Sequence, residues 1–303
     1  MISVILPTFN RSNMIVRSIC SVLNQTYKDF ELIIVDDGST DCTQDMVSRI
    51  KDSRIRYIRH EKNKGAAAAR NTGIKAAQCD LIAFQDSDDE WVPGKLEKQI
   101  KAILALPDDF GVIYSAFWRL GKQKIYIPRK NISIKEGWMY KQLLYGNIVG
   151  MPVSLIKKEC FNVVGGFSEN LRALEDWELF LRISKFFKFK YIDEPLVLSY
   201  ETEGSVSKNV LAHAEAYEYI LANNYSAISI DKKLLAQYIY IIGRINFQAG
   251  NVQKGKEYLI KAWKERPFNV KYNVAVILSF FGKEFFDNII RLKSMLRNIF
   301  TNY

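Results

Sequence analysis

Short apolar runs alternate with helical patterns along the first part of the chain. The apolar runs predict buried strands at 2–6, 31–35, 55–59 and 81–84. Between them, helical patterns span 14–23, 43–50 and 66–77, the last being alanine-rich and therefore of high helix propensity. This alternation predicts an α/β fold, Rossmann-like, with a mostly parallel sheet and helices on both faces.

Polar groups follow three of these strands directly, at residues 7–8, 36–37 and 86–88. In an open parallel sheet, ligands bind beyond the carboxyl ends of the strands, so the three groups should share one edge. Asp86 and Asp88 could there share one hard divalent cation, Mn²⁺ or Mg²⁺, whose shell is often completed by substrate phosphates. A solvated acidic turn is the alternative, and the convergence of three groups favours the functional interpretation.

Three further side chains suit a nucleotide at this edge. A carboxylate such as Asp37 can accept the ring N–H of a pyrimidine, and Arg70 and Lys64 could offset the charge of a diphosphate. For Arg70 and Lys64 a solvated helix face is an equally good explanation. The sequence contains neither G-x-G-x-x-G nor the P-loop motif, which excludes those two nucleotide fingerprints.

Composition limits the partners. The 303 residues are 48% hydrophobic, enough for one large core and a smaller second unit. A formal net charge of +10 suits an anionic partner: a nucleoside diphosphate, an anionic membrane surface or nucleic acid. No stacking-aromatic or groove-reading motif supports nucleic acid, so we expect no nucleic-acid partner.

Cysteine usage and hydropathy indicate the compartment. The four cysteines form no C-x-x-C pair, and we expect buried thiols in a reducing environment, without a disulfide framework or zinc site. The first strand lacks the basic n-region of a signal peptide, and no run approaches the ~20 apolar residues of a spanning helix. We therefore expect a cytoplasmic protein, either free or peripheral on the inner face of the cytoplasmic membrane.

Four motifs carry a family resemblance. They are SVILPTFNR at 3–11, IVDDGS at 34–39, NKG at 63–65 with ARN at 69–71, and FQDSDD at 84–89. In this order they resemble glycosyltransferase family 2, the inverting enzymes of the GT-A fold, over about the first two-thirds of the chain. The resemblance implies a nucleotide-sugar donor, usually a UDP sugar, held by Mn²⁺ or Mg²⁺.

The resemblance also implies roles for individual residues. Asp86 and Asp88 form the D-x-D motif, with Asp88 the stronger metal ligand, and Asp37 contacts the base. The predicted donor-binding residues are Pro7, Thr8, Phe9, Asp37, Lys64, Arg70, Asp86 and Ser87.

The stretch LEDWELFLR at 174–182 predicts a helix with Glu175 and Asp176 at its N-terminus. Acidic residues there are favoured as caps and by the helix dipole, which is a sufficient structural explanation. Inverting transfer needs one base to deprotonate the acceptor hydroxyl. The resemblance places that base at Asp176, after the Gly-Gly-Phe turn at 165–167, with Glu175 in a supporting role; a base and a cap can be the same residue.

After residue 200 the pattern becomes almost entirely helical. We therefore expect a catalytic domain at 1–205 and an all-helical C-terminal extension at 206–303, with 202–208 as a linker or a lid over the donor site.

Two features stand out in the extension. Residues 236–269 resemble a single degenerate tetratricopeptide repeat, for which a generic helical hairpin is an equal alternative. Residues 272–303 are apolar with interspersed lysine and arginine, a basic amphipathic tail that suits a membrane interface or a second subunit of a homo-oligomer.

These features together predict a metal-dependent inverting glycosyltransferase. It would move a sugar from a nucleoside diphosphate donor to a hydroxyl of a glycan or lipid-linked oligosaccharide, in bacterial surface polysaccharide biosynthesis. The alternative is a non-catalytic nucleotide-sugar-binding or scaffold protein with a partner-docking tail, against which the intact D-x-D and Glu-Asp pairs argue. His60 and His213 show no metal-ligand spacing, and we expect them to be surface or core residues.

Overall fold

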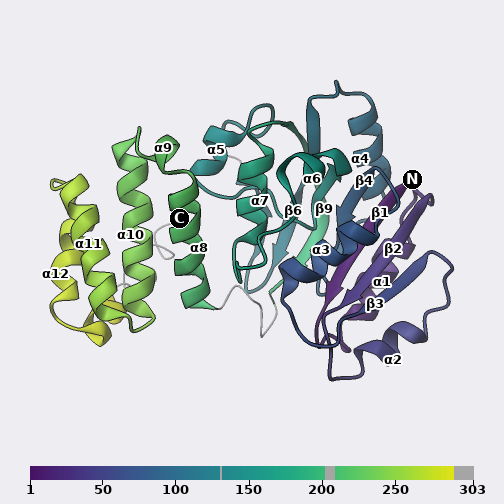
Figure 1. The fold of residues 1–303 in the computed structure, drawn as a ribbon, viewed down its shortest axis with the longest axis horizontal. Helices are drawn as coiled ribbons and strands as arrows, with labels where there is room; N and C mark the ends of the chain where they lie inside the picture. Colours follow the sequence, from purple (N-terminus) through teal and green to yellow (C-terminus); the bar gives the residue numbers. More distant parts are fainter. Residues whose placement is uncertain (130–131, 202–208, 290–303) are drawn as a thin grey trace. The chain divides into compact units, whose positions relative to one another are not determined.

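The structure is a computed structural model that describes residues 1–129, 132–201 and 209–289 (Figure 1). The chain divides into two compact units, 1–205 and 206–303. Residues 202–208, expected to form a linker or lid, lie outside the described part.

The first unit is built around one large sheet. Its strands are β1 (Ile2–Thr8), β2 (Phe30–Asp36), β3 (Ile55–Arg59), β4 (Leu81–Phe84), β5 (Glu90–Trp91), β6 (Phe110–Leu120), β7 (Lys124–Ile127), β8 (Ser154–Lys157) and β9 (Lys188–Tyr200). Its helices are α1 (Ile15–Leu23), α2 (Thr43–Ser48), α3 (Ala66–Ala76), α4 (Lys95–Leu104), α5 (Tyr140–Leu144), α6 (Lys158–Val164) and α7 (Glu175–Ile183).

The strands run in the order β3-β2-β1-β4-β8-β6-β9-β5, with β7 paired to β6. The first four are mutually parallel, whereas β8 is antiparallel to both β4 and β6. Every residue of β1 and β2 is buried, which requires cover on both faces of the sheet. The expected α/β class is therefore confirmed. The sheet is mixed: pairing is parallel among the N-terminal strands and between β6 and β9, and antiparallel for β5, β7 and β8.

Helix α3 lies unusually close to β1. A methyl group added at Gly73 would come within 2.4 Å of the Ile5 side chain, so only glycine permits this approach. Arg70 lies one turn earlier on the same helix and is 7% exposed. The close packing of α3 thus fixes where the Arg70 guanidinium meets the carboxyl edge of the sheet.

Two further parts of the chain differ from what their sequence favours. The basic, irregular stretch 122–135 favours a solvated loop over a hairpin, but the structure forms the hairpin, in which β7 pairs antiparallel with the end of β6. Residues 130–131 are outside the described part. All four cysteines are free, and Cys79 and Cys160 are buried as expected, whereas Cys20 is half-buried and Cys42 is exposed because it precedes the short surface helix α2.

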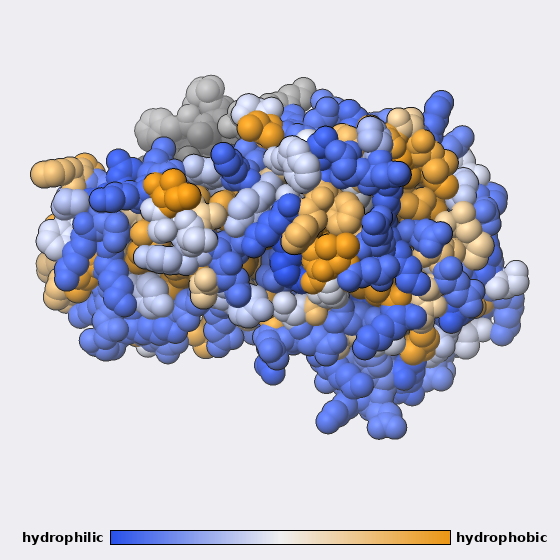
Figure 2. Space-filling view, turned by 45° about the horizontal axis from the view of Figure 1, so that its top comes forward, coloured by the Kyte–Doolittle hydropathy of each residue, from blue (hydrophilic) through white to orange (hydrophobic). Residues whose placement is uncertain are grey.

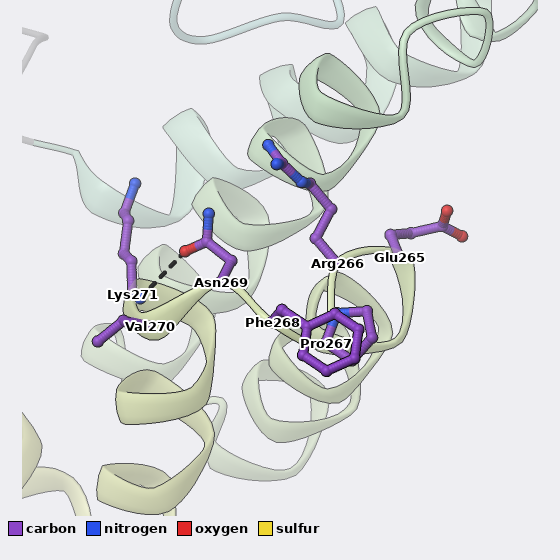
Figure 3. Close-up of a pocket in the computed structure, with 7 residues that line it drawn as sticks. All are labelled: Glu265, Arg266, Pro267, Phe268, Asn269, Val270 and Lys271. Atoms are coloured by element: carbon purple, nitrogen blue, oxygen red, sulfur yellow. Dashed lines mark hydrogen bonds between the residues drawn. The ribbon is translucent and has the colours of Figure 1, made fainter.

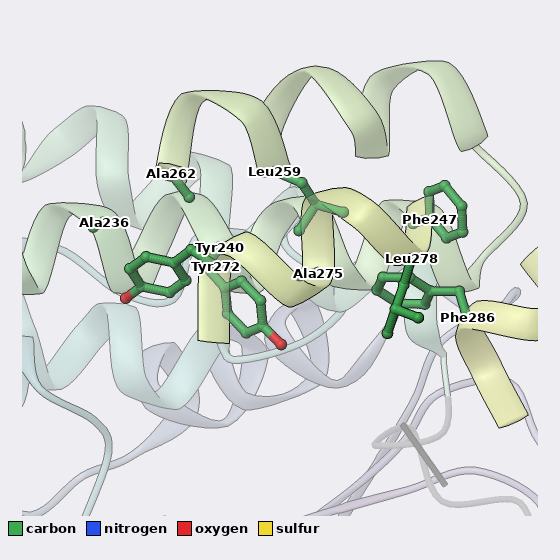
Figure 4. Close-up of a cluster of buried hydrophobic side chains, with 9 residues drawn as sticks. All are labelled: Ala236, Tyr240, Phe247, Leu259, Ala262, Tyr272, Ala275, Leu278 and Phe286. Carbon is green, nitrogen blue, oxygen red and sulfur yellow. The ribbon is translucent and has the colours of Figure 1, made fainter. Parts of the chain in front are cut away.

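The second unit is helical: α8 (Val210–Asn223), α9 (Tyr225–Ile228), α10 (Lys232–Gln248), α11 (Val252–Glu265) and α12 (Val270–Ser279). Aromatic and small residues from α10, α11 and α12 interlock in its core (Figure 4). The side chains of Asn209, Asp231 and Asn269 cap α8, α10 and α12 by accepting backbone N–H bonds. Helices α10 and α11 form the expected hairpin; its kinship to a tetratricopeptide repeat stays a prediction.

The C-terminal tail is not one continuous helix over its described part. Helix α12 ends at Ser279, the backbone turns at Gly282 with a φ of 91°, and residues 283–289 are helical again. Glycine adopts this left-handed conformation without steric cost, which explains the break. Residues 290–303 lie outside the described part. Among the described helices, none combines the length and apolar character needed to cross a bilayer.

Candidate active site

The loops that follow the parallel strands meet at one edge of the sheet. The backbone N–H of Asp37, after β2, donates to the carbonyl of Thr8 at the end of β1, at 2.8 Å. The Arg11 guanidinium, in the loop after β1, lies 3.6 Å from the Asp88 carboxylate after β4. The structure thus brings together the three groups that the sequence places after strands.

Asp37 is buried and anchors the segment that leads into α3. Its Oδ1 accepts a hydrogen bond from Lys64 N (2.9 Å) and contacts His60 Nδ1 (2.7 Å), and its Oδ2 accepts from Gly65 N (2.7 Å). A carboxylate has about four acceptor positions, so Asp37 retains capacity for one further donor. His60 is a core residue, as expected, and it bridges Asp37 and the Thr72 hydroxyl (2.9 Å).

The remaining predicted donor residues occupy the same edge in different environments. Thr8 and Ser87 are buried, whereas Phe9 is 41% exposed. The Lys64 side chain is exposed and only its backbone takes part in the Asp37 contacts. Thr8 Oγ1 is a buried polar atom with no hydrogen-bond partner among the described residues. An orphaned hydroxyl beside an exposed aromatic ring suits a polar, planar ligand such as a nucleobase.

Arg70 joins the two halves of the site. One guanidinium nitrogen donates to Glu175 Oε1 at 2.7 Å and the other to Asp86 Oδ1 at 3.0 Å. Glu175 stands 105 positions later in the chain than Arg70, so this fork connects the D-x-D loop directly to the start of α7. The Arg70 Nε is a further buried donor without a partner among the described residues.

Asp176 begins α7 next to Glu175, facing the same charges. Its Oδ2 accepts from Asn147 Nδ2 at 3.1 Å, and its Oδ1 accepts from the backbone N–H of Trp177 at 2.7 Å. Burial, followed by the negative charge of Glu175, raises the pKa of Asp176 from its ordinary value of 3.8 to about 7. A carboxyl group with such a pKa can accept a proton near neutral pH.

The site concentrates carboxyl groups. Burial raises the pKa of Asp86 while Arg70 lowers it, and the neighbouring Asp88 and Glu175 raise it further. Burial together with Asp86 and Asp88 also raises the pKa of Asp89. Mutually repelling carboxylates gain from a divalent cation, and all the available ligand atoms are oxygens, as Mg²⁺ and Mn²⁺ prefer.

The protein supplies only part of a metal shell. Within the described ranges, no group of three or more His, Cys, Asp or Glu side chains is arranged to hold a metal ion. Asp86 and Asp88 therefore fit a cation that takes one or two carboxylates and completes its coordination with phosphate oxygens and water.

Several residues at this edge carried no sequence signal. Arg17 donates to the backbone carbonyl of Asp88 at 2.6 Å and stacks on the ring of Tyr200, 3.9 Å from its centroid. Asn71 bonds both the N–H (2.8 Å) and the carbonyl (3.0 Å) of Phe167 in the Gly-Gly-Phe turn. Only the position of Asn71, beside Arg70 in the ARN motif, could have pointed to it.

Comparison with known proteins agrees with this geometry. The family model described as glycosyl transferase family 2 matches residues 3–155. The chain belongs to glycosyl transferase family 2. The family match covers the parallel strands, Arg70 and the D-x-D motif, and ends before α7.

Curated relatives share the N-terminal part of the chain. An uncharacterized glycosyltransferase of Rickettsia felis is 37% identical over 64% of this chain and 32% of its own length. This chain therefore spans about a third of that relative. The Escherichia coli UDP-Glc:alpha-D-GlcNAc-diphosphoundecaprenol beta-1,3-glucosyltransferase WfgD is 35% identical over 61% of this chain and 70% of its own length.

Solved structures show the same fold at low sequence identity. Staphylococcus aureus TarS 1-349 in complex with UDP-GlcNAc has a TM-score of 0.70 and 18% identity, covering 98% of this chain and 91% of that chain. The mannosyltransferase PcManGT from Pyrobaculum calidifontis, in complex with GDP-Man and Mn²⁺, has a TM-score of 0.58 and 17% identity, covering 94% and 85%. These likenesses confirm the expected GT-A fold.

Proposed function

We propose that this protein transfers a sugar, with inversion, from a UDP sugar to a hydroxyl group of a lipid-linked glycan in surface polysaccharide synthesis. The observation that carries the proposal is the Arg70 fork, which holds Asp86 of the D-x-D loop and Glu175 of α7 in one cluster. Family membership and the printed activity of the relative WfgD support the donor and acceptor classes.

The donor lies along the edge formed by the loops after β1, β2 and β4. The base stacks on Phe9, and Asp37 and the Thr8 hydroxyl bond its polar edge. Lys64 and Arg70 face the diphosphate, to which Arg70 Nε, a buried donor with no partner among the described residues, donates a hydrogen bond. Ser87 belongs to the same loop as Asp86 and Asp88, and Pro7 is buried near the end of β1, where it pairs with Val35.

Asp86 and Asp88 would hold Mn²⁺ or Mg²⁺. Each offers carboxylate oxygens at the carboxyl edge of the sheet, and the crowding of acids there is relieved by a cation. Such an ion stabilises the negative charge that develops on the leaving diphosphate.

Asp176 acts as the base. Its carboxylate removes the proton from the acceptor hydroxyl, whose oxygen forms a bond to the anomeric carbon as the bond to the diphosphate oxygen breaks. Asn147 and the Trp177 N–H orient Asp176. The negative charge of Glu175 helps to keep the pKa of Asp176 high, and Arg70 pairs with Glu175. Four free cysteines suit a cytoplasmic location for this reaction.

Calorimetry with UDP tests the donor site separately from transfer. We expect saturable heat with Mn²⁺ present and a large loss of that heat in Asp88→Asn. The matched control is Asp80→Asn, an exposed carboxylate in the turn between α3 and β4, which should bind like the parent. Equal UDP binding in Asp88→Asn would reject the metal assignment, and no UDP binding by the parent chain would favour the scaffold alternative.

A transfer assay then tests the reaction itself. A panel of UDP sugars is incubated with a polyprenyl-diphosphate-linked acceptor, and the stereochemistry of the product is determined by NMR. We expect one donor to give product with the opposite anomeric configuration. Retention of configuration would contradict the single-base mechanism.

A further inference from the structure

The outward face of α12 is apolar. Val270, Val274, Ile277 and Phe281 follow one another at intervals of four, three and four residues, and they are 73%, 42%, 58% and 66% exposed. This spacing places Val270, Val274 and Ile277 on one side of α12, and Phe281 follows two residues after the helix ends. We call these four residues the apolar stripe. A surface helix normally turns polar residues outward, so the apolar stripe calls for an explanation.

The opposite side of α12 already has its partner. Tyr272, Ala275 and Leu278 are buried and belong to the cluster shared with α10 and α11 (Figure 4). The helix is thus apolar on two sides, of which the core of the unit covers only one. Most of the face shown in Figure 2 is hydrophilic, so a continuous apolar row differs from the greater part of that face.

Aromatic side chains extend the apolar stripe at both ends. Phe268 lies in the turn before α12 and is 98% exposed, and Phe280 and Phe285 after the helix are 66% and 46% exposed. The turn of residues 265–271 also lines a hollow of about 490 Å³ (Figure 3). Exposed phenylalanine side chains can insert into the interface of a lipid bilayer, which needs no preformed pocket to receive them.

Positive charge borders this surface. Lys271 is exposed in the first turn of α12, with its ammonium 4.1 Å from the ring centroid of Tyr240, and the Lys256 ammonium lies 5.0 Å from the ring centroid of Phe280. Arg266 adds a positive charge in the turn that lines the hollow. Two acids also lie near this surface, and each is next to a basic residue in the sequence: Glu265 beside Arg266, and Glu284 beside Lys283.

The second unit as a whole also carries a net positive charge. Residues 206–303 contain 14 Lys and Arg against seven Asp and Glu, a net charge of +7 out of the chain's +10. Two copies meeting through this face would bring like charges together, which disfavours a dimer. An anionic surface gains from both the apolar residues and the charge.

We propose that the apolar stripe, with Phe268, Phe280 and Phe285, docks this protein on an anionic phospholipid surface. The apolar side chains enter the boundary between head groups and acyl chains, and Lys256 and Lys271 pair with lipid phosphates. The inference rests on the proposed function only in explaining what docking achieves, which is to bring the enzyme to a lipid-linked acceptor. The docking residues themselves belong to the second unit.

Vesicle sedimentation with the purified full chain tests this proposal. Binding is measured on vesicles of phosphatidylglycerol and phosphatidylcholine and on vesicles of phosphatidylcholine alone. We expect at least tenfold stronger binding to the anionic vesicles at low salt. The double variant Ile277→Asn/Phe281→Asn should bind at least tenfold more weakly, and Lys256→Gln/Lys271→Gln should lose most of the preference for anionic lipid.

Ile230→Asn is the matched control, because Ile230 is 85% exposed in the same unit but lies outside the apolar stripe. Its binding should equal that of the parent chain. Circular dichroism and thermal melting confirm that each variant is folded, which we expect because every replaced side chain except Lys256 is exposed. UDP calorimetry on the same variants should be unchanged, so failure here is distinguishable from failure of the catalytic proposal.

Two results would overturn the inference. One is equal binding of the folded parent and Ile277→Asn/Phe281→Asn, or no binding of either, to anionic vesicles. The other is a dimer of the parent chain in light scattering that this double variant dissociates, which would assign the apolar stripe to a second copy.

Discussion

Replacing Asp176 by asparagine should lower activity and raise stability at the same time. The loss of the base should slow transfer by about 10²–10⁴-fold, the usual contribution of a positioned proton acceptor. Stability changes in the opposite direction because the fold removes this carboxylate from much of its solvent and places it beside Glu175.

The pH dependence of the stability effect follows from the raised pKa. Below pH 4 Asp176 is protonated in both the folded and the unfolded chain, so it does not oppose folding there. As the pH rises from about 4 to about 7, the unfolded chain loses this proton before the folded chain does, and stability falls. Above pH 7 the loss is complete.

The size of the effect can be bounded. The difference between a pKa of 3.8 and one of about 7 corresponds to at most about 4 kcal/mol. Asp176 is partly exposed, and solvent screening reduces this, so we expect Asp176→Asn to be more stable than the parent by about 1–2 kcal/mol at pH 8. At pH 4 the two proteins should be equal.

Urea unfolding at pH 4, 6 and 8 measures the stability of both proteins, and a transfer assay measures activity. Asp80→Asn, at an exposed carboxylate, is the control and should change neither quantity. The reasoning fails if Asp176→Asn transfers sugar at a rate within twofold of the parent. It also fails if the stability difference between the two proteins is the same at pH 4 and pH 8.

Three further predictions concern the same cluster. Arg70→Met should destabilise the fold by about 3–5 kcal/mol at pH 7 in urea unfolding, because it leaves Asp86 and Glu175 without their buried cation; unchanged stability of the variant would contradict this cause. Asp88→Asn should keep the melting temperature within a few degrees yet abolish the Mn²⁺ dependence of UDP binding; unchanged Mn²⁺ titrations would refute it. Asn71→Ala should lower the free energy of unfolding by about 1–3 kcal/mol, since it leaves the N–H and the carbonyl of Phe167 in the Gly-Gly-Phe turn without their partner. Asn71→Asp can accept from the Phe167 N–H but cannot donate to its carbonyl, so it should recover less than half of the loss.

The strand-end groups could be predicted because they follow from local patterns. Apolar runs that stop at Thr8, Asp37 and Asp86 define the edge of a parallel sheet, whose topology then brings the groups together. The helix at Glu175 was equally visible in its periodicity. The contact of Arg70 with both Asp86 and Glu175 was not, because it spans 105 residues and depends on how closely α3 packs against β1.

The pattern of apolar and polar residues did not predict strand β9. Its residues include charges at Asp193 and Glu194 followed by Pro195, a combination that argues against a strand inside a sheet. The structure accommodates them through shifts of register against β6, one of them between the pairs Ser115–Ile192 and Ala116–Pro195. A register shift depends on the partner strand, so one strand's own sequence does not reveal it.

The Arg70 fork sets a lower limit on the length of a working fragment. The family model ends at residue 155, but one of the two acids that neutralise this buried guanidinium belongs to α7. A fragment trimmed at that boundary would keep the nucleotide half and leave an interior cation with a single counter-ion. Any shortened version made for crystallisation or domain grafting must therefore extend through Ile183, even though the sequence match alone gives no reason to do so.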